Sequence, residues 1–114
     1  MTPETIIARL DSAIAGYGQS VTLQRTSVDS ASGEVTVGET LVCPAMVRAS
    51  GPQDLQAGEV LSIRIVVSPT GLGGWGLPSR DDRIVIDGDE SNLEQVVPIY
   101  YGGRLTRVNL LARG

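Results

Sequence analysis

The side chains best suited to chemistry are few in this sequence, and their types exclude most kinds of catalytic site. Cys43 is the single cysteine, and the sequence contains no histidine. A thiol without histidine lacks its usual general base, and neither a Ser–His pair nor an HExxH zinc motif can form. Cys43 follows an apolar stretch and precedes Pro44, so we expect a buried structural thiol. A single cysteine also excludes an internal disulfide and a cysteine-cluster zinc site.

Three glycines, Gly71, Gly73 and Gly76, match the G-x-G-x-x-G spacing of dinucleotide-binding loops. That motif works because a helix follows it and meets the pyrophosphate with its N-terminus. Here Pro78, Ser79 and two aspartates follow, without an apolar stripe at helical spacing. We therefore interpret the match as a chance one and expect no cofactor.

An acidic segment has part of a calcium-binding pattern. Asp87, Asp89 and Ser91 have the initial spacing of an EF-hand loop, which also needs Gly at its sixth position and Glu at its twelfth. Those two positions are Asn92 and Pro98, so we expect a solvated turn and no metal site.

The pair Asp81 and Asp82 could supply two catalytic carboxylates. Adjacent residues of a strand point in opposite directions, so this pair would not face a common substrate. With the other motifs excluded, the sequence predicts a binding or assembly protein and not an enzyme.

Composition supports one small β-rich domain. The chain has 114 residues, of which 41% are hydrophobic and 4% aromatic, and it has no Phe. Its net charge is −4, and every basic residue is Arg. Proteins that bind nucleic acid by neutralising phosphates usually have the opposite balance. No apolar run approaches the roughly 20 residues that span a membrane, and the N-terminus lacks the pattern of a secretory signal. We therefore expect a cytosolic protein without a membrane partner.

Residues 1–18 have the pattern of an amphipathic helix. Thr2 is a candidate N-cap, Pro3 suits the first helical position, and Gly16 and Gly18 follow the last apolar residue. The candidate docking face of this helix consists of Ile6, Ile7, Leu10 and Ile14. A helix of this length is marginal alone in water, so we expect it to dock on its own sheet or on a neighbouring subunit.

From residue 20 onward the apolar period changes to two, which is typical of strands. The expected strands are 20–28, 34–37, 42–49 with Pro44 at a strand edge or start, 60–67, 83–87, 93–101 broken by Pro98, and 106–112. Turns are expected at 29–33, at Asp87-Gly88 and at 101–104, and a polar connection with one helical turn at 54–57 is expected over 50–58. The predicted fold is mainly β: a small barrel or sandwich of six or seven short antiparallel strands, one N-terminal helix and a long Gly-rich loop. Residues 19–114 would form one barrel domain, from which loop 68–82 projects.

The loop 68–82 is the strongest candidate for an interaction site, because a structureless loop of this length is more often functional than idle. Its single Trp75 either folds back and caps the barrel or anchors another molecule. The candidate interaction residues are Gly71, Leu72, Gly73, Gly74, Trp75, Gly76, Leu77 and Arg80.

An ordered set of short motifs carries a resemblance to a known family. Val21-Thr-Leu-Gln-Arg25 precedes a Ser/Gly hairpin and Ala45-Met-Val-Arg48, and Leu61-Ser-Ile-Arg-Ile65 follows. Then come Ser79-Arg-Asp-Asp-Arg-Ile-Val-Ile-Asp-Gly88, Val97-Pro-Ile-Tyr-Tyr-Gly-Gly103 and Arg107-Val-Asn-Leu-Leu111. Over residues 20–114 this order is similar to the head-closure, or head–tail joining, proteins of the neck of tailed bacteriophages. Asp89-Glu90-Ser91 departs from the family, which often has an aromatic residue after the central Asp-Gly.

The resemblance implies a virion protein of the phage neck, assembled in the bacterial cytoplasm. Its partners would be further copies of itself in a ring, the portal or adaptor protein and the tail proteins, with genomic DNA only passing through the channel. Such a stopper ring would help to retain the packaged genome. Loop 68–82 would be the gating or docking loop, so deletion of 70–77 should leave the domain folded and abolish assembly.

Three other functions stay open. One is a related tail-completion or adaptor protein of the same neck region. A second is a nucleic-acid-binding barrel of the oligonucleotide-binding type, with Tyr100, Tyr101, Arg104 and Arg107 as a basic aromatic patch. The third is a small adaptor without a phage role.

Overall fold

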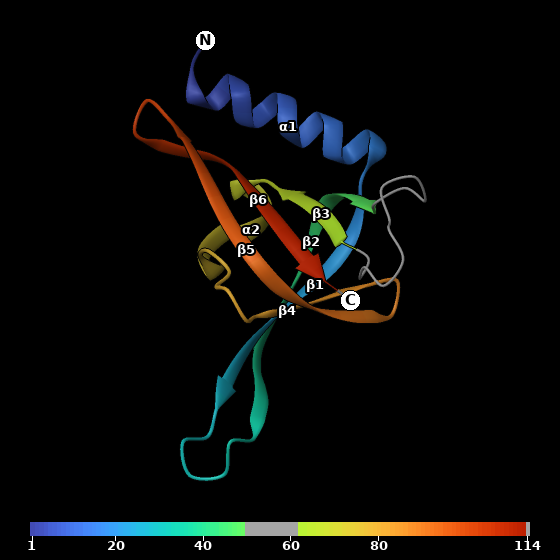
Figure 1. Ribbon diagram of the computed structural model, residues 1–114. Coiled ribbons are helices and arrows are strands. Elements are labelled where there is room, and N and C mark those ends of the chain that lie inside the picture. The colour runs from blue at the N-terminus through green and yellow to red at the C-terminus, as the bar shows by residue number, and fades with distance from the viewer. Residues whose placement is uncertain (50–61, 114) are drawn as a thin grey trace.

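The structure is a computed structural model that describes residues 1–49 and 62–113 (Figure 1). Its helices are α1 (Pro3–Tyr17), α2 (Pro69–Leu72) and the 3₁₀ turn η2 (Gly73–Trp75). Its strands are β1 (Gln19–Val28), β2 (Val35–Ala49), β3 (Ser62–Val67), β4 (Arg83–Ile86), β5 (Asp89–Tyr101) and β6 (Arg104–Arg113). The polar connection 50–58, the helical turn 54–57 and the first residues of the strand expected at 60–67 lie outside the described residues.

The six strands of the described chain form one closed antiparallel barrel in the order β1-β2-β3-β6-β5-β4. β4 closes it by pairing back onto β1, with Thr22 opposite Val85 and Gln24 opposite Arg83. Closure leaves the body of the barrel without a free edge. The mainly β fold with one N-terminal helix is therefore confirmed.

The barrel is filled by the inward side chains of alternating strand positions. Leu23, Ile65, Ile84 and Leu93 have less than 2% of their surface exposed, and they come from four different strands. Burying one such side chain stabilises the fold by about 1.5–3 kcal/mol. Cys43 is also fully buried in this core, so the predicted structural thiol is confirmed.

Two expected strand breaks are absent from the described residues. The segments 34–37 and 42–49 are parts of the single strand β2, and β5 runs unbroken through Pro98. Pro44 in β2 and Pro98 in β5 are both tolerated because each strand is paired on one side only at its proline. β2 begins to pair with β3 only at Ala45, and β5 pairs with β4 only up to Asn92. The expected edge position of Pro44 fits this pairing.

The predicted turns have the backbone that their residues favour. Asp87 and Gly88 have φ of 51° and 84°, the pair of left-handed conformations that a two-residue hairpin requires. Gly102 and Gly103, with φ of 60° and 79°, make the turn between β5 and β6.

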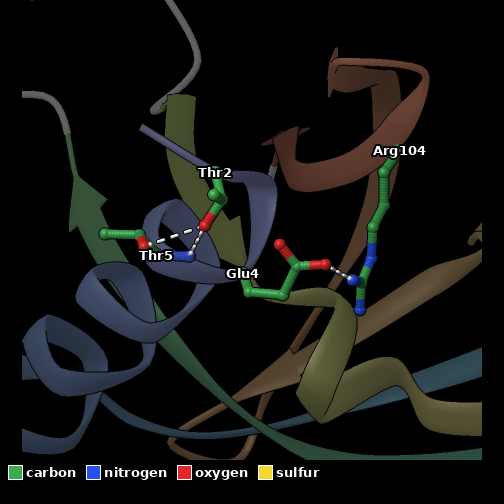
Figure 2. A network of polar contacts seen from close by, with 4 residues as sticks. All are labelled: Thr2, Glu4, Thr5 and Arg104. Atoms are coloured by element: carbon green, nitrogen blue, oxygen red, sulfur yellow. Dashed lines mark hydrogen bonds and ion pairs between the residues drawn. The ribbon is translucent and has the colours of Figure 1, made fainter.

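The helix α1 begins as the sequence predicts and lies across one end of the barrel (Figure 1). The Thr2 side chain accepts a hydrogen bond from the Thr5 backbone N–H at 3.2 Å. Figure 2 shows this cap beside an ion pair in which Arg104 of β6 lies 2.5 Å from the Glu4 carboxylate. The pKa of Glu4 is held below its ordinary value, first by a hydrogen bond from its own backbone and also by the Arg104 charge.

The outer parts of β1 and β2 leave the barrel as a two-stranded ribbon (Figure 1). Pairs from Thr26–Val37 to Val28–Val35 continue the ladder beyond the last contact with β4. The turn is closed by hydrogen bonds from the Asp29 N–H to the Glu34 carbonyl and from the Gly33 N–H to the Asp29 carbonyl. We refer to residues 26–39 as the ribbon.

Candidate interaction site

The segment 68–82 is folded onto the barrel, so the prediction of a projecting, structureless loop is wrong. Ser68 caps α2 by accepting a hydrogen bond from the Thr70 N–H at 3.2 Å. Pro69 fits the first turn of this helix because its missing N–H needs no partner there. Leu72 is only 3% exposed and belongs to the barrel core. The glycine content misled the sequence prediction, since capping and burial order the segment.

The glycine at position 71 allows α2 to lie close to β2. A Cβ added to Gly71 would lie 3.4 Å from Cδ of Pro44 and 3.6 Å from Cβ of Cys43. Two of the three glycines of the nucleotide-like motif have positive φ, 53° for Gly73 and 88° for Gly76. These glycines therefore serve backbone turns.

The side chain of Trp75 is turned back toward the barrel, which is the capping alternative of the two predicted. It is half-buried and packs against the core cluster. The Arg25 guanidinium lies over its ring, 4.1 Å from the centroid, and also donates a hydrogen bond to the Trp75 carbonyl. Arg25 lies opposite a β-bulge, where Gly38 and Glu39 of β2 face this single residue of β1 and the ladder is locally disrupted.

The second half of the segment is fastened through Asp82, which the sequence analysis did not single out as a structural residue. Asp82 is 6% exposed and lies in a turn, not in a strand as the sequence analysis assumed. Its carboxylate accepts hydrogen bonds from the Ser79 N–H at 2.8 Å and the Thr26 N–H at 3.3 Å. The preceding Asp81 has φ of 78°, and its carbonyl accepts from the Thr26 hydroxyl at 3.0 Å.

The candidate loop residues thus fall into two groups. Leu72, Gly71 and Trp75 pack against the barrel, whereas Gly73, Gly74, Gly76, Leu77 and Arg80 are exposed. The exposed group remains accessible to a partner.

The predicted docking face of α1 is used within the chain. Ile7 and Ile14 are 8% and 5% exposed, and Ile6 and Leu10 are half-buried. The helix contacts β6 and β2 of its own barrel. The sequence predicted that this helix docks either on its own sheet or on a neighbouring subunit, and in the described structure it docks on its own sheet.

The structure brings the helix and the segment 68–82 together. A cavity of about 410 Å³ lies between α1 and α2 and is lined by Ile14, Pro44 and Gly71 among others. At its rim the Thr70 hydroxyl donates a hydrogen bond to the Asp11 carboxylate at 2.8 Å. This cavity is mostly apolar, and a hydrogen bond between two side chains of the chain already satisfies the polar groups at its rim.

Two surface features were missed by the sequence analysis. The first is the valine face of the ribbon, formed by Val28, Val35 and Val37, which are 65%, 43% and 44% exposed. The sequence did carry a signal for this face, because these valines alternate with polar residues. The alternation was interpreted as that of a strand with one face on the core, so an exposed apolar face was not expected. The second is the arginine strip, formed by Arg48, Arg64 and Arg107 on the outer surface of β2, β3 and β6. Of these three, the sequence analysis named only Arg107 as a candidate binding residue, as part of a basic aromatic patch.

Within residues 1–49 and 62–113 no group of acidic or cysteine side chains is arranged to hold a metal ion. No helix in this described part of the chain is long and apolar enough to cross a membrane. No protein-family model and no curated protein matches this sequence. The fold defines the class: a closed six-stranded antiparallel barrel, over the described residues, with a helix across one end and a projecting ribbon.

Proposed function

We propose that the chain is a structural assembly protein of a bacteriophage neck, where it joins the DNA-filled head to the tail. The observation that carries the proposal is the ribbon: a closed barrel extends two strands into solvent with an exposed valine face. An isolated two-stranded hairpin is marginal in water, so a ribbon of this kind indicates a surface that another protein covers. The resemblance of the ordered motifs to those of head-closure proteins supports the choice of partner class.

In this role the chain would form a ring with copies of itself and would contact the portal or adaptor protein and the tail proteins. The charge of −4 suits a channel wall past which DNA must move, because like charge repels the phosphates. No reaction is required of the protein.

Electron microscopy of particles made after silencing the gene tests the role. Heads without tails, beside complete free tails, are the expected result. Infectious particles of normal appearance would overturn the neck role and leave the small adaptor function. Heads without tails, beside incomplete tails, would favour the related tail-completion role at the same location.

A nucleic-acid-binding barrel is the second candidate, and the arginine strip is the observation that favours it. A gel shift with single-stranded DNA at low salt decides, since binding through phosphates is strongest there. A shift that disappears when Arg64 and Arg107 are changed to Glu would support this candidate, and the absence of any shift would remove it.

A further inference from the structure

The ribbon has two unlike faces. Cross-strand partners lie on the same side of a ladder, so the pairs Thr26–Val37 and Val28–Val35 place the three valines on one face. On the other face Ser27 and Thr36 are hydrogen-bonded through their hydroxyls at 2.8 Å. The hydroxyl groups of one face are therefore hydrogen-bonded within the ribbon, while the apolar side chains of the valine face are exposed to solvent.

The ribbon is also uniformly acidic. Between Arg25 and Arg48 the charged residues are Asp29, Glu34 and Glu39, and none is basic. Asp29 and Glu34 flank the turn at the tip. All three carboxylates are on exposed residues, and none takes part in an ion pair within the described chain.

A groove that is lined by apolar and basic side chains lies on the outer face of the barrel, over β3, β6 and β5. It has a volume of about 440 Å³, and its lining includes Val66, Val97 and Leu111. Arg64 and Arg107 also line it. The strand registers place Val97, Asn109 and Val66 in one row and Gln95, Leu111 and Arg64 in the next.

The arginines at this groove lack acidic partners within residues 1–49 and 62–113. Arg48 lies directly opposite Arg64 on the same outer face. Two like charges in this position repel each other and destabilise the pair of strands. By contrast, Arg83, Arg104 and Arg113 each have a carboxylate within 4 Å. The arginine strip therefore offers positive charge that an acidic partner could neutralise.

We propose that the valine face of the ribbon of one copy binds in the arginine-edged groove on β3, β6 and β5 of the next copy. The valines would cover Val66, Val97 and Leu111, and the acidic turn would meet the arginine strip. The ribbon extends away from its own barrel (Figure 1), so a second copy is required. The ribbon, with its apolar valine face and its acidic turn, matches the groove in both polarity and charge, whereas nucleic acid would match its charge alone.

The two surfaces are different, so the contact is head-to-tail. Such contacts repeat from copy to copy and give a ring when the rotation closes. The inference deepens the proposed function, because it names the surface through which one subunit of the neck ring would hold the next. A single ribbon gives an interface at the small end of the usual range, so we expect self-association that depends on concentration and salt.

Sedimentation velocity of the whole chain, from about 1 µM to about 1 mM, tests the contact over the range of Kd that a small interface gives. The wild type should associate at low salt and dissociate as salt screens the charges. A ribbon variant, Glu34→Arg with Glu39→Arg, and a groove variant, Arg64→Glu with Arg107→Glu, should each raise the Kd at least tenfold or so.

Mixing the two variants is the decisive step. The basic ribbon of the first variant then meets the acidic groove of the second, and the acidic ribbon of the second meets the basic groove of the first. Association should return in the mixture alone. Arg9→Glu reverses a charge at an exposed position of α1, away from the ribbon and the groove, and should associate as the wild type does. Circular dichroism confirms that each variant is folded.

Three results would overturn the inference: a wild type that stays monomeric at every concentration, a groove variant that associates normally, or a mixture that stays monomeric. A monomeric wild type that binds single-stranded DNA through the arginine strip would replace it with the nucleic-acid function. Association through another surface would overturn the contact and leave the neck role intact, which the silencing experiment measures separately.

Discussion

The guanidinium of Arg25 lies 4.1 Å from the centroid of the Trp75 ring and also donates a hydrogen bond to the Trp75 carbonyl. The two residues are 50 positions apart, one in β1 opposite a β-bulge of β2 and the other at the end of η2. This contact, together with the burial of Leu72, ties the glycine-rich segment 68–82 to the barrel. The segment is therefore part of what holds the barrel together as well as a candidate surface.

Replacement of Trp75 by Ala should destabilise the fold by about 2 kcal/mol, less than the 3–5 kcal/mol of a fully buried large aromatic residue. Arg25→Lys should cost about 1 kcal/mol, because a lysine keeps the charge but loses the planar contact with the ring. A double-mutant cycle in urea should give a coupling of about 1 kcal/mol between the two residues. Coupling near zero would contradict the contact.

Deletion of residues 70–77 should prevent folding or destabilise it severely, contrary to the expectation for a projecting loop. The deletion removes the buried Leu72 and the packed Trp75, and a small domain has only about 5–15 kcal/mol of stability in total. Circular dichroism and a urea titration measure the outcome. A deleted protein with wild-type stability would restore the idea of a dispensable, purely interacting loop.

Local chemistry allowed the helix and the tight turns to be predicted from the sequence. Thr2 and Pro3 define the start of α1, and Asp87-Gly88 has the residues that a two-residue hairpin requires. Alternation identified the buried strands, because each has one face on the core. These features depend on residues that are neighbours in the chain.

Features that depend on distant residues could not be predicted. The ribbon part of β2 packs on no core, so Gly38, Glu39 and Thr40 show no alternation and the strand was divided in two. The position of Trp75 depends on a bulge opposite Arg25, and the burial of Asp82 depends on the Thr26 N–H. The groove exists only after β3, β6 and β5 become neighbours.

Asp82 should be essential to the turn before β4. Asp82→Ala leaves the Ser79 and Thr26 N–H groups without their acceptor, at a cost of about 1–3 kcal/mol. Asp82→Asn keeps one oxygen and should cost less. Asp81→Asn is the matched control, since Asp81 is exposed and Asn accepts its positive φ readily. Equal stability of all three variants in a urea titration would argue against this role.

The two glycines at the end of α1 should respond in opposite directions to alanine. A Cβ on Gly18 would lie 2.5 Å from the Ile14 carbonyl oxygen and 2.6 Å from that of Ala45, so backbone must move and about 1–3 kcal/mol should be lost. Gly16 has nothing within 4 Å of such a Cβ and lies inside the helix. Gly16→Ala should therefore stabilise by about 0.5–1 kcal/mol. Thermal unfolding of the two variants distinguishes the signs.

The buried thiol should make stability fall in alkaline solution. Burial raises the pKa of the Cys43 thiol to about 11, from an ordinary value near 9. Between these values the unfolded chain loses the thiol proton and the folded chain retains it. The contribution of the protonated thiol to the free energy of unfolding is therefore fully present below pH 9. It is lost as the pH rises toward 11, which lowers this free energy by on the order of 2 kcal/mol.

The effect of Cys43 has to be isolated by comparison with a variant that lacks the thiol. Cys43→Ala supplies the difference: the gap in unfolding free energy between wild type and variant should narrow as the pH rises from 9 to 11. The same burial should protect the thiol, so a thiol reagent at neutral pH should modify Cys43 at the rate of unfolding. Fast modification of the folded protein, or a gap that does not change with pH, would show that the thiol is open to solvent.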